Sequence, residues 1–424
     1  MSLYGGLPGL EEELIKCMKC GNCQAVCPLY RETWAEVSVA RGKIRLAQAV
    51  LRGELKPSPQ LAKLFEFCLT CMACSANCPC GVRVDRIILA ARNVMVKNTG
   101  LSSLKKAAIT GLSSPALLRS GLGAARAVQG LLFKRQGDLM NPRFPIGLEM
   151  RRALPPLADS FLRDSLPEVI KSCQSGRRIL FFTGCMINYV YPSAGRAIVN
   201  VLQRNGFEVI IPSGQHCCGS PVTIMGDHDT AERMALSHVE MFSSINCDAV
   251  ITACGTCGES LREFYPAFLE GGRWGARARE LAGKTFDIYE YLVEKTDIDL
   301  RQLGPVEKTF TYHQPCHLAR GLGVKEQPVE LLKRIPGLDY SPLKDPGRCC
   351  GGSGSFSLTD YDTSCGVRTH KLKDIERSGA ELVATGCGSC RMHIQDGLVQ
   401  NGMAATVRHA VELLDESYRN REKR

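Results

Sequence analysis

The sequence contains neither a long apolar run nor the beginning of a secreted protein. No stretch reaches the ~18 uninterrupted apolar residues of a membrane-spanning helix, and the nearest one, 116–133, is broken by Arg119 and Arg126. Residues 1–14 include three consecutive glutamates where a secretory signal would have an apolar core. We therefore expect a cytoplasmic protein that is not transmembrane, with peripheral docking on the inner face of the membrane left open.

Aromatic residues and nucleotide-binding glycine motifs are also scarce. Aromatic residues make up 6% of the chain, and no basic run is interleaved with them, although the net charge of +10 invites a nucleic-acid interpretation. A solvated basic surface, or a face for an acidic partner, explains this charge more simply. No Gly-x-Gly-x2-Gly follows a predicted strand, and the glycine-rich stretch 351–354 belongs to a cysteine pair. We expect no nucleic-acid partner and no flavin in this chain.

Cysteine is the residue that the sequence has in excess, with 22 among 424 residues. Secreted disulfide frameworks reach such a density, but they are small domains from oxidising compartments. In a long chain without a secretory start, clustered cysteines indicate metal binding or redox chemistry.

Two identical cysteine patterns lie near the N-terminus. Residues 17–28 and 68–79 both follow Cys-x2-Cys-x2-Cys-x3-Cys-Pro. This is the bacterial 4Fe–4S cubane pattern, in which three cysteines hold one cluster and the fourth reaches the other. Zinc ribbons are the alternative, but they use two cysteine pairs rather than runs of four followed by proline. We predict two cubane sites, one of Cys17, Cys20, Cys23 and Cys78, the other of Cys68, Cys71, Cys74 and Cys27.

Helical periodicity surrounds these runs. Apolar residues at helical spacing predict helices over 39–55, 60–67 and 84–97. Residues 1–100 therefore form a mostly helical ferredoxin domain. Residues 101–177 are expected to be a helical and proline-rich linker, whose amphipathic part covers a neighbouring domain more readily than it binds a membrane.

A second group of cysteines follows predicted strands. Apolar runs at 178–183, 207–211 and 248–253, separated by helical patterns at 192–205 and 227–245, predict a parallel sheet. Loops that leave the carboxyl ends of parallel strands converge on one crevice. The thiols that follow the three runs should meet there: Cys185, Cys217, Cys218, Cys254 and Cys257.

The same arrangement recurs further along the chain. Runs at 309–313, 338–340 and 381–385 lead to Cys316, Cys349, Cys350, Cys387 and Cys390. Corresponding cysteines are offset by 131 (185 to 316), 132 (217 to 349) and 133 (254 to 387), which indicates an internal duplication. The predicted fold is therefore α+β and multi-domain, with duplicated α/β domains at 178–300 and 301–415 and a charged tail at 416–424.

Adjacent cysteines suit an extended cluster in which each sulfur binds a different iron. Five thiolates also exceed the four ligands that zinc prefers. Gly219 and the glycines at 351–352 would let the backbone approach inorganic sulfur closely. A thiol–disulfide relay at the Cys-x2-Cys pairs is the alternative, but it leaves Cys185 and Cys316 unexplained.

Several residues beside these motifs have two interpretations. The histidines near the cluster cysteines could tune a potential or protonate a thiolate, although ordinary packing or hydrogen bonding explains each of them more simply. They are His216, His313, His317 and His393. The cysteines outside the motifs are expected to be inert, and they are Cys80, Cys173, Cys247 and Cys365.

The double-cysteine pattern resembles the "CCG" domain pair. That pair occurs in the catalytic subunit of heterodisulfide reductases and in the iron–sulfur subunits of glycolate and D-lactate oxidases and of anaerobic glycerol-3-phosphate dehydrogenase. With the cubane runs included, the layout is most similar to the iron–sulfur subunit of FAD-linked glycolate or lactate dehydrogenases. In the reductases, the five cysteines of such a motif hold a noncubane iron–sulfur cluster, and all ten positions are present here.

The resemblance implies two 4Fe–4S cubanes, one or two CCG-type clusters, and an electron-transfer role. An FAD-containing dehydrogenase subunit would oxidise a 2-hydroxy acid, lactate or glycolate, and electrons would pass to a quinone or another carrier. An electron-transfer flavoprotein or a quinone-linked membrane component would be a further partner. The alternative is a reductase that cleaves a disulfide at a noncubane cluster. Many glycolate oxidase subunits lack the first cysteine of the last pair, whereas Cys387 is retained here, as in the reductases.

Overall fold

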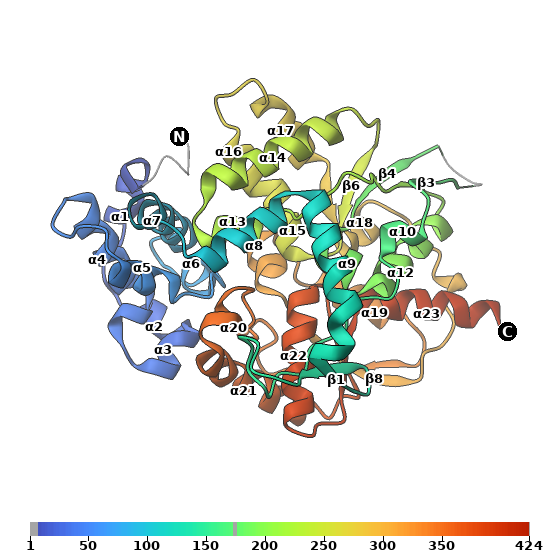
Figure 1. The fold of residues 1–424 in the computed structure, drawn as a ribbon. Helices are drawn as coiled ribbons and strands as arrows, with labels where there is room; N and C mark the ends of the chain where they lie inside the picture. Colours follow the sequence, from blue (N-terminus) through green and yellow to red (C-terminus); the bar gives the residue numbers. More distant parts are fainter. Residues whose placement is uncertain (1–6, 173–175, 424) are drawn as a thin grey trace.

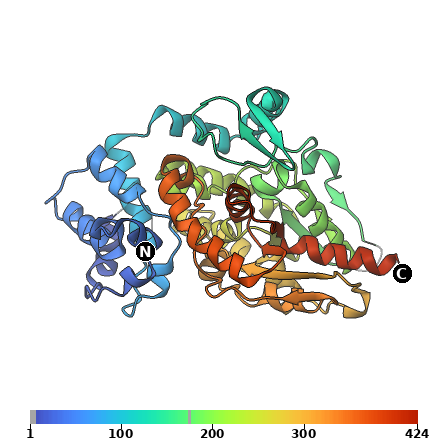
Figure 2. The ribbon, with the colours of Figure 1, turned by 90° about the horizontal axis from the view of Figure 1, so that it is seen from below.

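The structure is a computed structural model that describes residues 7–172 and 176–423. A group of N-terminal helices lies at one end, and two sheets with their surrounding helices form the rest of the molecule (Figure 1). Figure 2 shows the segment after the N-terminal helices running across the top of the sheet-containing part. The α+β multi-domain architecture expected from the sequence is confirmed.

The N-terminal part is mostly helical, as predicted. Leu14, Ile44, Phe65 and Ile87 form part of its buried core. Helix α5 begins where Ser58 accepts a hydrogen bond from the Leu61 amide, as an N-cap serine does. The helices are α1 (Glu11–Ile15), α2 (Asn22–Val26), α3 (Pro28–Thr33), α4 (Ala40–Leu51), α5 (Pro59–Glu66), α6 (Ala73–Ala76) and α7 (Val84–Thr99).

The segment that follows packs against both sheet domains. It forms α8 (Ser103–Ser113), α9 (Pro115–Leu132) and an antiparallel hairpin of β1 (Phe133–Gln136) and β2 (Leu139–Pro142). Helix α8 lies on helices α13 (Ser220–Met225) and α14 (His228–Ser243) of the first sheet domain. The Ala153 amide then donates to the Asp396 carboxylate at 2.7 Å, and the buried Arg152 guanidinium donates to the Ser357 carbonyl at 2.9 Å. These contacts anchor the proline-rich stretch.

The first sheet has the strand order β3-β5-β4-β6-β7, and of its described strands β3 alone is antiparallel. Its strands are β3 (Val169–Ile170), β4 (Arg178–Phe182), β5 (Glu208–Ile210), β6 (Ala249–Thr252) and β7 (Thr285–Asp287). Its helices are α10 (Leu162–Ser165), α11 (Gly184–Tyr189), α12 (Pro192–Arg204), α13 (Ser220–Met225), α14 (His228–Ser243), α15 (Gly255–Glu259), α16 (Tyr265–Phe268), α17 (Gly275–Gly283) and α18 (Ile288–Glu294).

The second sheet is all parallel, with the order β11-β10-β8-β9. Its strands are β8 (Lys308–His313), β9 (Leu338–Tyr340), β10 (Leu382–Thr385) and β11 (Thr406–His409). Its helices are a π-helical turn η5 (His317–Gly321), α19 (Gln327–Lys333), α20 (Phe356–Thr359), α21 (Tyr361–Ser378), α22 (Gly388–Gln400) and α23 (Ala410–Glu422). Taken by their place in each repeat, the parallel strands of the two sheets have the same spatial order, so the duplication extends to the topology.

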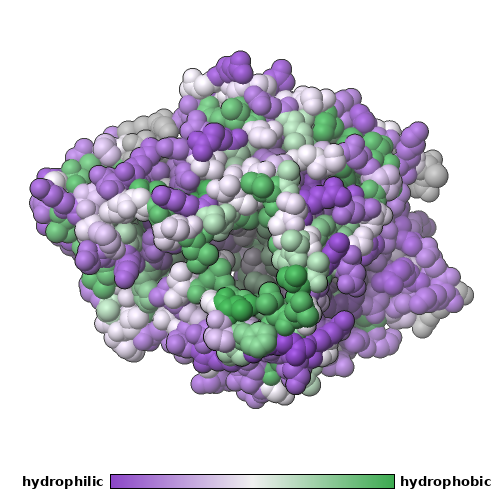
Figure 3. All heavy atoms as spheres, in the orientation of Figure 1, coloured by the Kyte–Doolittle hydropathy of each residue, from purple (hydrophilic) through white to green (hydrophobic). Residues whose placement is uncertain are grey.

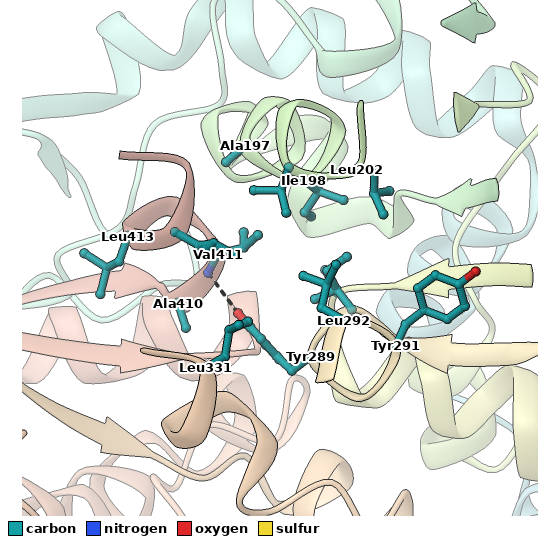
Figure 4. Close-up of a cluster of buried hydrophobic side chains, with 14 of the residues drawn as sticks. Ala197, Ile198, Leu202, Tyr289, Tyr291, Leu292, Leu331, Ala410, Val411 and Leu413 are labelled. Carbon is teal, nitrogen blue, oxygen red and sulfur yellow. Dashed lines mark hydrogen bonds between the residues drawn. The ribbon is translucent and has the colours of Figure 1, made fainter. Parts of the chain in front are cut away.

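The two sheet domains share a core. Figure 4 shows Ala197, Ile198 and Leu202 of α12 facing Val411 of α23. The Tyr289 hydroxyl of α18 accepts a hydrogen bond from the Val411 amide at 3.0 Å. Because helices of each repeat pack on helices of the other, the two sheets hold a fixed position relative to each other.

The C-terminal residues belong to this shared core. We expected a charged tail over 416–424, but α23 continues to Glu422. Ser417 and Tyr418 are buried, and the Ser417 hydroxyl donates to the Gly304 carbonyl at 2.7 Å. The charged residues of this stretch obscured the apolar side of a helix.

Candidate iron–sulfur centres

The thiols of the two N-terminal runs line two neighbouring cavities. One cavity is lined by Cys17, Cys20, Cys23 and Cys78, with Cys74 and Cys80 also at its wall. The other is lined by Cys27, Cys68, Cys71 and Cys74. Each cavity therefore contains the first three thiols of one run and the fourth thiol of the other.

Two buried cations lie beside the second of these cavities, and the sequence reasoning missed both. The Lys43 ammonium donates to the Leu64 carbonyl, and burial lowers the pKa of this lysine to about 8. The Arg92 guanidinium donates to the Cys68 carbonyl at 2.7 Å and to the Ile224 carbonyl at 2.9 Å. Positive charge next to thiolates stabilises their ionised form. Lys43 interrupts the apolar side of a predicted helix, which is the signal that could have identified it.

The five thiols of the first sheet domain meet at the carboxyl ends of its strands. Cys217 is in hydrogen-bonding contact with Cys185 and Cys218, and Cys218 also contacts Cys257, which contacts Cys254. All are buried except Cys185, which is half-buried. The hydrogen bond from Cys217 lowers the pKa of the Cys218 thiol well below its ordinary value, so this thiol is readily ionised.

The second sheet domain repeats this arrangement. Cys349 contacts Cys316 and Cys350, and Cys390 contacts Cys350 and Cys387. All five of these thiols are buried. The structure thus brings together, in two separate groups, the ten cysteines that the sequence grouped by duplication.

The donor set and the backbone around both groups fit an iron–sulfur cluster. Five soft thiolate donors gathered at one point suit iron–sulfur chemistry better than they suit a hard cation. Gly184 has a φ of +62°, and a Cβ there would lie 2.9 Å from the Cys257 Sγ. Gly351 has a φ of +88°, and a Cβ there would lie 2.5 Å from the Ser364 carbonyl oxygen. Glycine at these positions keeps the space beside the thiols free.

The sulfur sites are contiguous. The Sγ atoms of Cys254 and Cys387 are 4.0 Å apart, which joins the two sheet domains. Cys349 is in hydrogen-bonding contact with Cys71, which joins the second sheet domain to the second N-terminal cavity. Within the described residues, thiols therefore run without a break from that cavity through the second sheet domain to the first.

Charged side chains hold these junctions. The His317 imidazole, next to Cys316, pairs with Glu259 of the other sheet domain. Although burial lowers the pKa of His317, the Glu259 carboxylate raises it to about 9. The Arg320 guanidinium donates to the Cys71 carbonyl at 3.0 Å and to the Gly347 carbonyl at 2.7 Å. Glu259 and Arg320 were not identified from the sequence, because their partners are distant in the chain.

The other predicted histidines have different surroundings. A His216 ring nitrogen lies 2.8 Å from the Cys217 carbonyl oxygen, and a His393 ring nitrogen lies 3.0 Å from the Ser364 hydroxyl. His313 is fully buried at the end of β8.

The cysteines outside the motifs occupy several places. Cys80 lines the first N-terminal cavity. Cys247 is half-buried, and Cys365 accepts a hydrogen bond from Arg368 at 3.3 Å. Cys173 lies outside the described residues.

One face of the molecule is hollowed near its centre, with apolar residues on the rim (Figure 3). Exposed apolar side chains occur on α9 and on the segment after β2, namely Leu117, Val128, Leu131, Phe144, Ile146 and Met150. Cys185 packs against the cluster that Leu118 of α9 forms with Phe161 and Tyr189, so this thiol of the first sheet domain lies close to α9. No described helix combines the length and the hydropathy that a membrane span requires.

Comparison with known proteins matches these parts to two families. A "Cysteine-rich domain" (CCG) matches residues 179–262 and again 310–395, and a "4Fe-4S dicluster domain" matches residues 13–82. The ten cysteines of the two sheet domains and the eight thiols of the N-terminal runs fall inside these matches.

One of the similar proteins is described as an iron–sulfur subunit. The probable glycolate oxidase iron-sulfur subunit of Bacillus subtilis is 28% identical over 430 residues, covering 96% of this chain and 94% of that protein. Lactate utilization protein A of Shouchella clausii is 34% identical over 239 residues, covering 56% of this chain and 98% of that protein. One subunit of a fumarate reductase (CoM/CoB) from Methanothermobacter marburgensis is 36% identical over 244 residues, or 57% of this chain and 47% of that protein.

A hypothetical protein from Helicobacter pylori has a related fold. Its crystal structure aligns with 97% of this chain and 72% of its own, with a TM-score of 0.56 and 10% sequence identity, so the likeness concerns the fold alone. The dicluster match, the duplicated cysteine-rich domains and the coverage of the lactate utilization relatives together show that this chain belongs to the CCG-domain family of iron–sulfur proteins.

Proposed function

We propose that this chain is the electron-transfer subunit of a dehydrogenase complex that oxidises a 2-hydroxy acid, lactate or glycolate. The observation that carries this proposal is the unbroken run of thiols through three sites, made by the Cys71–Cys349 and Cys254–Cys387 contacts. A chain that only used clusters for stability would have no need to bring separate sites into contact. The similarity to glycolate oxidase and lactate utilization proteins supplies the substrate class.

The proposed ligand sets follow from the cavities. Cys17, Cys20, Cys23 and Cys78 would hold the first cubane, and Cys68, Cys71, Cys74 and Cys27 the second. The two CCG sites would each use their five thiols, Cys185, Cys217, Cys218, Cys254 and Cys257 in the first and Cys316, Cys349, Cys350, Cys387 and Cys390 in the second. Iron–sulfur clusters accept and release single electrons, at potentials set by cluster charge, hydrogen bonds to sulfur and exposure.

The contacts give the order of the sites. The first cubane cavity shares Cys74 with the second, the second touches the second CCG site through Cys71, and that site touches the first CCG site through Cys387. Cys20 is exposed at one end of this line, and Cys185 is half-buried at the other. Exchange with partners would take place at these two ends.

The hydroxy acid needs a partner. Its oxidation removes two electrons and protons, a task for an organic cofactor such as a flavin, and this sequence has no flavin fingerprint. We infer that an FAD-containing subunit supplies the electrons, and that a quinone-linked component or an electron-transfer flavoprotein takes them up.

Reduction of a disulfide at a CCG site is the second candidate. Cys387 is retained, and its sulfur lies 4.0 Å from Cys254, where the two CCG sites meet. The relative described as a fumarate reductase (CoM/CoB) subunit points the same way. Such a reaction would take place where both sites can deliver an electron.

A single preparation separates the two candidates. The tagged chain is purified without oxygen from its own host, and associated subunits are identified together with bound FAD. For the first candidate, lactate or glycolate added to the complex should reduce the clusters, seen by low-temperature EPR, and removal of the flavoprotein should abolish this. If the isolated chain instead reduces a disulfide with an artificial donor, and no hydroxy acid reduces the complex, the second candidate replaces the first.

A further inference from the structure

The two CCG repeats differ at one position beside their clusters. With the offset of 131 residues, His313 at the end of β8 corresponds to Phe182 at the end of β4. Both side chains are buried, with exposed fractions of 0% and 1%. Phe182 has ordinary apolar packing, with its ring centroid 5.9 Å from that of Phe242. The second repeat thus places a polar ring where the first has a hydrocarbon ring.

The ring nitrogens of His313 have no conventional hydrogen-bond partner in the part of the chain that the structure describes. Neither of the two has an oxygen or nitrogen hydrogen-bond partner among the described residues. Buried polar groups in native proteins are nearly always satisfied, and an exception needs a specific explanation. The three other histidines beside the CCG cysteines, His216, His317 and His393, each have a polar partner within hydrogen-bonding reach.

Sulfur is what the His313 ring approaches. One ring nitrogen and the Sγ atoms of Cys350 and Cys390 all lie within 4.8 Å of one another. These two cysteines come from the cysteine pair and from the last Cys-x2-Cys, so they are ligands from different loops. One nitrogen and two sulfurs that face a common point form three corners of a metal site. Imidazole is an established iron ligand in iron–sulfur centres, since histidines replace cysteines on one iron of the Rieske cluster.

We propose that a ring nitrogen of His313 is a sixth protein ligand of the second CCG site and binds the same iron as Cys350 and Cys390. The first CCG site has no equivalent, because the residues that correspond to these three are Phe182, Cys218 and Cys257. The two CCG centres are therefore chemically different, and the one with nitrogen ligation is the one next to the cubanes. This inference rests on the proposed cluster at the second CCG site, and not on the identity of the electron donor or acceptor.

The direct test is nitrogen hyperfine spectroscopy of the full-length protein. The protein is prepared with 14N-histidine and with 15N-histidine, poised at potentials that make the CCG centres paramagnetic, and examined by pulsed EPR. We expect a strongly coupled nitrogen on one CCG centre that changes with the histidine isotope. This measurement uses the native sequence, so it does not depend on the folding of a variant.

Two variants assign the nitrogen. His313→Phe installs the residue of the first repeat and should abolish the coupling, while the cubane signals and the signal of the first CCG centre persist. His393→Gln is the matched control, because His393 is also buried in the second repeat but lies 3.0 Å from the Ser364 hydroxyl, and it should leave the coupling intact.

The outcomes separate this inference from the proposed function. Suppose that iron analysis accounts for both CCG centres. If no histidine-dependent coupling is then found, or if the coupling survives in His313→Phe, the ligand assignment alone is wrong. Iron analysis that accounts only for the cubanes would overturn the cluster at the second CCG site, and the ligand assignment would fall with it.

Discussion

Replacement of Gly255 by alanine tests how the two CCG sites are held together. Gly255 is the first residue of α15, directly after Cys254. A Cβ there would lie 2.5 Å from the Leu318 amide nitrogen and 2.8 Å from its Cα. Because the obstacle is backbone of η5, it cannot be relieved by a rotamer change, and the two repeats would have to move apart.

Two effects of this substitution have opposite signs. Alanine has the higher helix propensity, by about 0.5–1 kcal/mol. Overpacking of a close contact costs about 1–3 kcal/mol, and more when backbone must shift. We expect the contact to dominate. With a contact cost of about 2–3 kcal/mol, because backbone must shift, and the propensity gain subtracted, the net loss is about 1–2.5 kcal/mol. For a unit of about 240 residues, 1 kcal/mol lowers the unfolding midpoint by about 2–4 °C, so the midpoint should fall by about 2–10 °C.

The assay is thermal unfolding under anaerobic conditions, together with EPR of the CCG centres. Gly123→Ala is the control, since Gly123 lies in α9, where an added Cβ would have no neighbour within 4 Å, and it should be neutral or slightly stabilising. The separation of the repeats should also change the signals of both CCG centres, because it lengthens the 4.0 Å contact of Cys254 with Cys387. An unchanged midpoint with unchanged spectra would refute the reasoning.

Four further substitutions test other parts of the molecule. Cys20→Ser should remove one cubane signal from the EPR spectrum of the reduced protein and leave the other, because Cys20 lines only the first cavity. Cys218→Ala should lower the iron content and spare both cubane signals, because this thiol belongs to a CCG site. Asp396→Ala should cost about 3–5 kcal/mol of unfolding free energy, measured with denaturant, because it leaves the buried Arg368 without its ion-pair partner. His228→Gln should flatten the dependence of stability on pH between about 6.5 and 4. Burial lowers the pKa of His228 from 6.5 to about 4, so the unfolded chain binds a proton that the folded one does not, and stability falls by up to about 3 kcal/mol as the pH drops through this window.

Each of these predictions has a contrary result. Two intact cubane signals in Cys20→Ser would contradict the proposed ligand sets, and unaltered iron in Cys218→Ala would favour a dithiol relay. Glu416→Ala, which breaks the half-exposed Arg408–Glu416 pair, is the control for Asp396→Ala. If Asp396→Ala costs no more than the ~0–1 kcal/mol of an exposed pair, the buried ion pair does not stabilise the fold as proposed. If the dependence of stability on pH is unchanged in His228→Gln, groups other than His228 cause the loss of stability in acid.

Local patterns in the sequence were sufficient for the elements and the thiol groups. All six strands predicted before the cysteines are present, because short runs of β-branched and apolar residues form buried parallel strands. The duplication could be recognised because the spacing between cysteines is nearly the same in both repeats, although many other side chains differ. Helices α4, α5 and α7 were likewise evident from their apolar periodicity.

Three of the four edge strands were not predicted. Strands β3, β7 and β11 have two to four residues each, and none of the predicted cysteine motifs follows them to mark their ends. The packed helix at the C-terminus was hidden for a related reason, since charged residues surround the few side chains that it buries. In both cases the stabilising contacts come from residues distant in the chain, and no local window contains them.

The sequence by itself predicted which cysteines would hold iron, because ligand spacing is a local property of loops and strand ends. Only the tertiary structure decided how the sites are arranged relative to one another. Cys254 meets Cys387 because helices of one repeat pack into the core of the other. Cys71 meets Cys349 where the N-terminal helices pack on the second sheet domain, and His313 meets Cys350 where the loops of the second repeat converge. Burial of apolar surface between distant segments drives that packing, and it leaves no signature in the spacing of the thiols that it brings together.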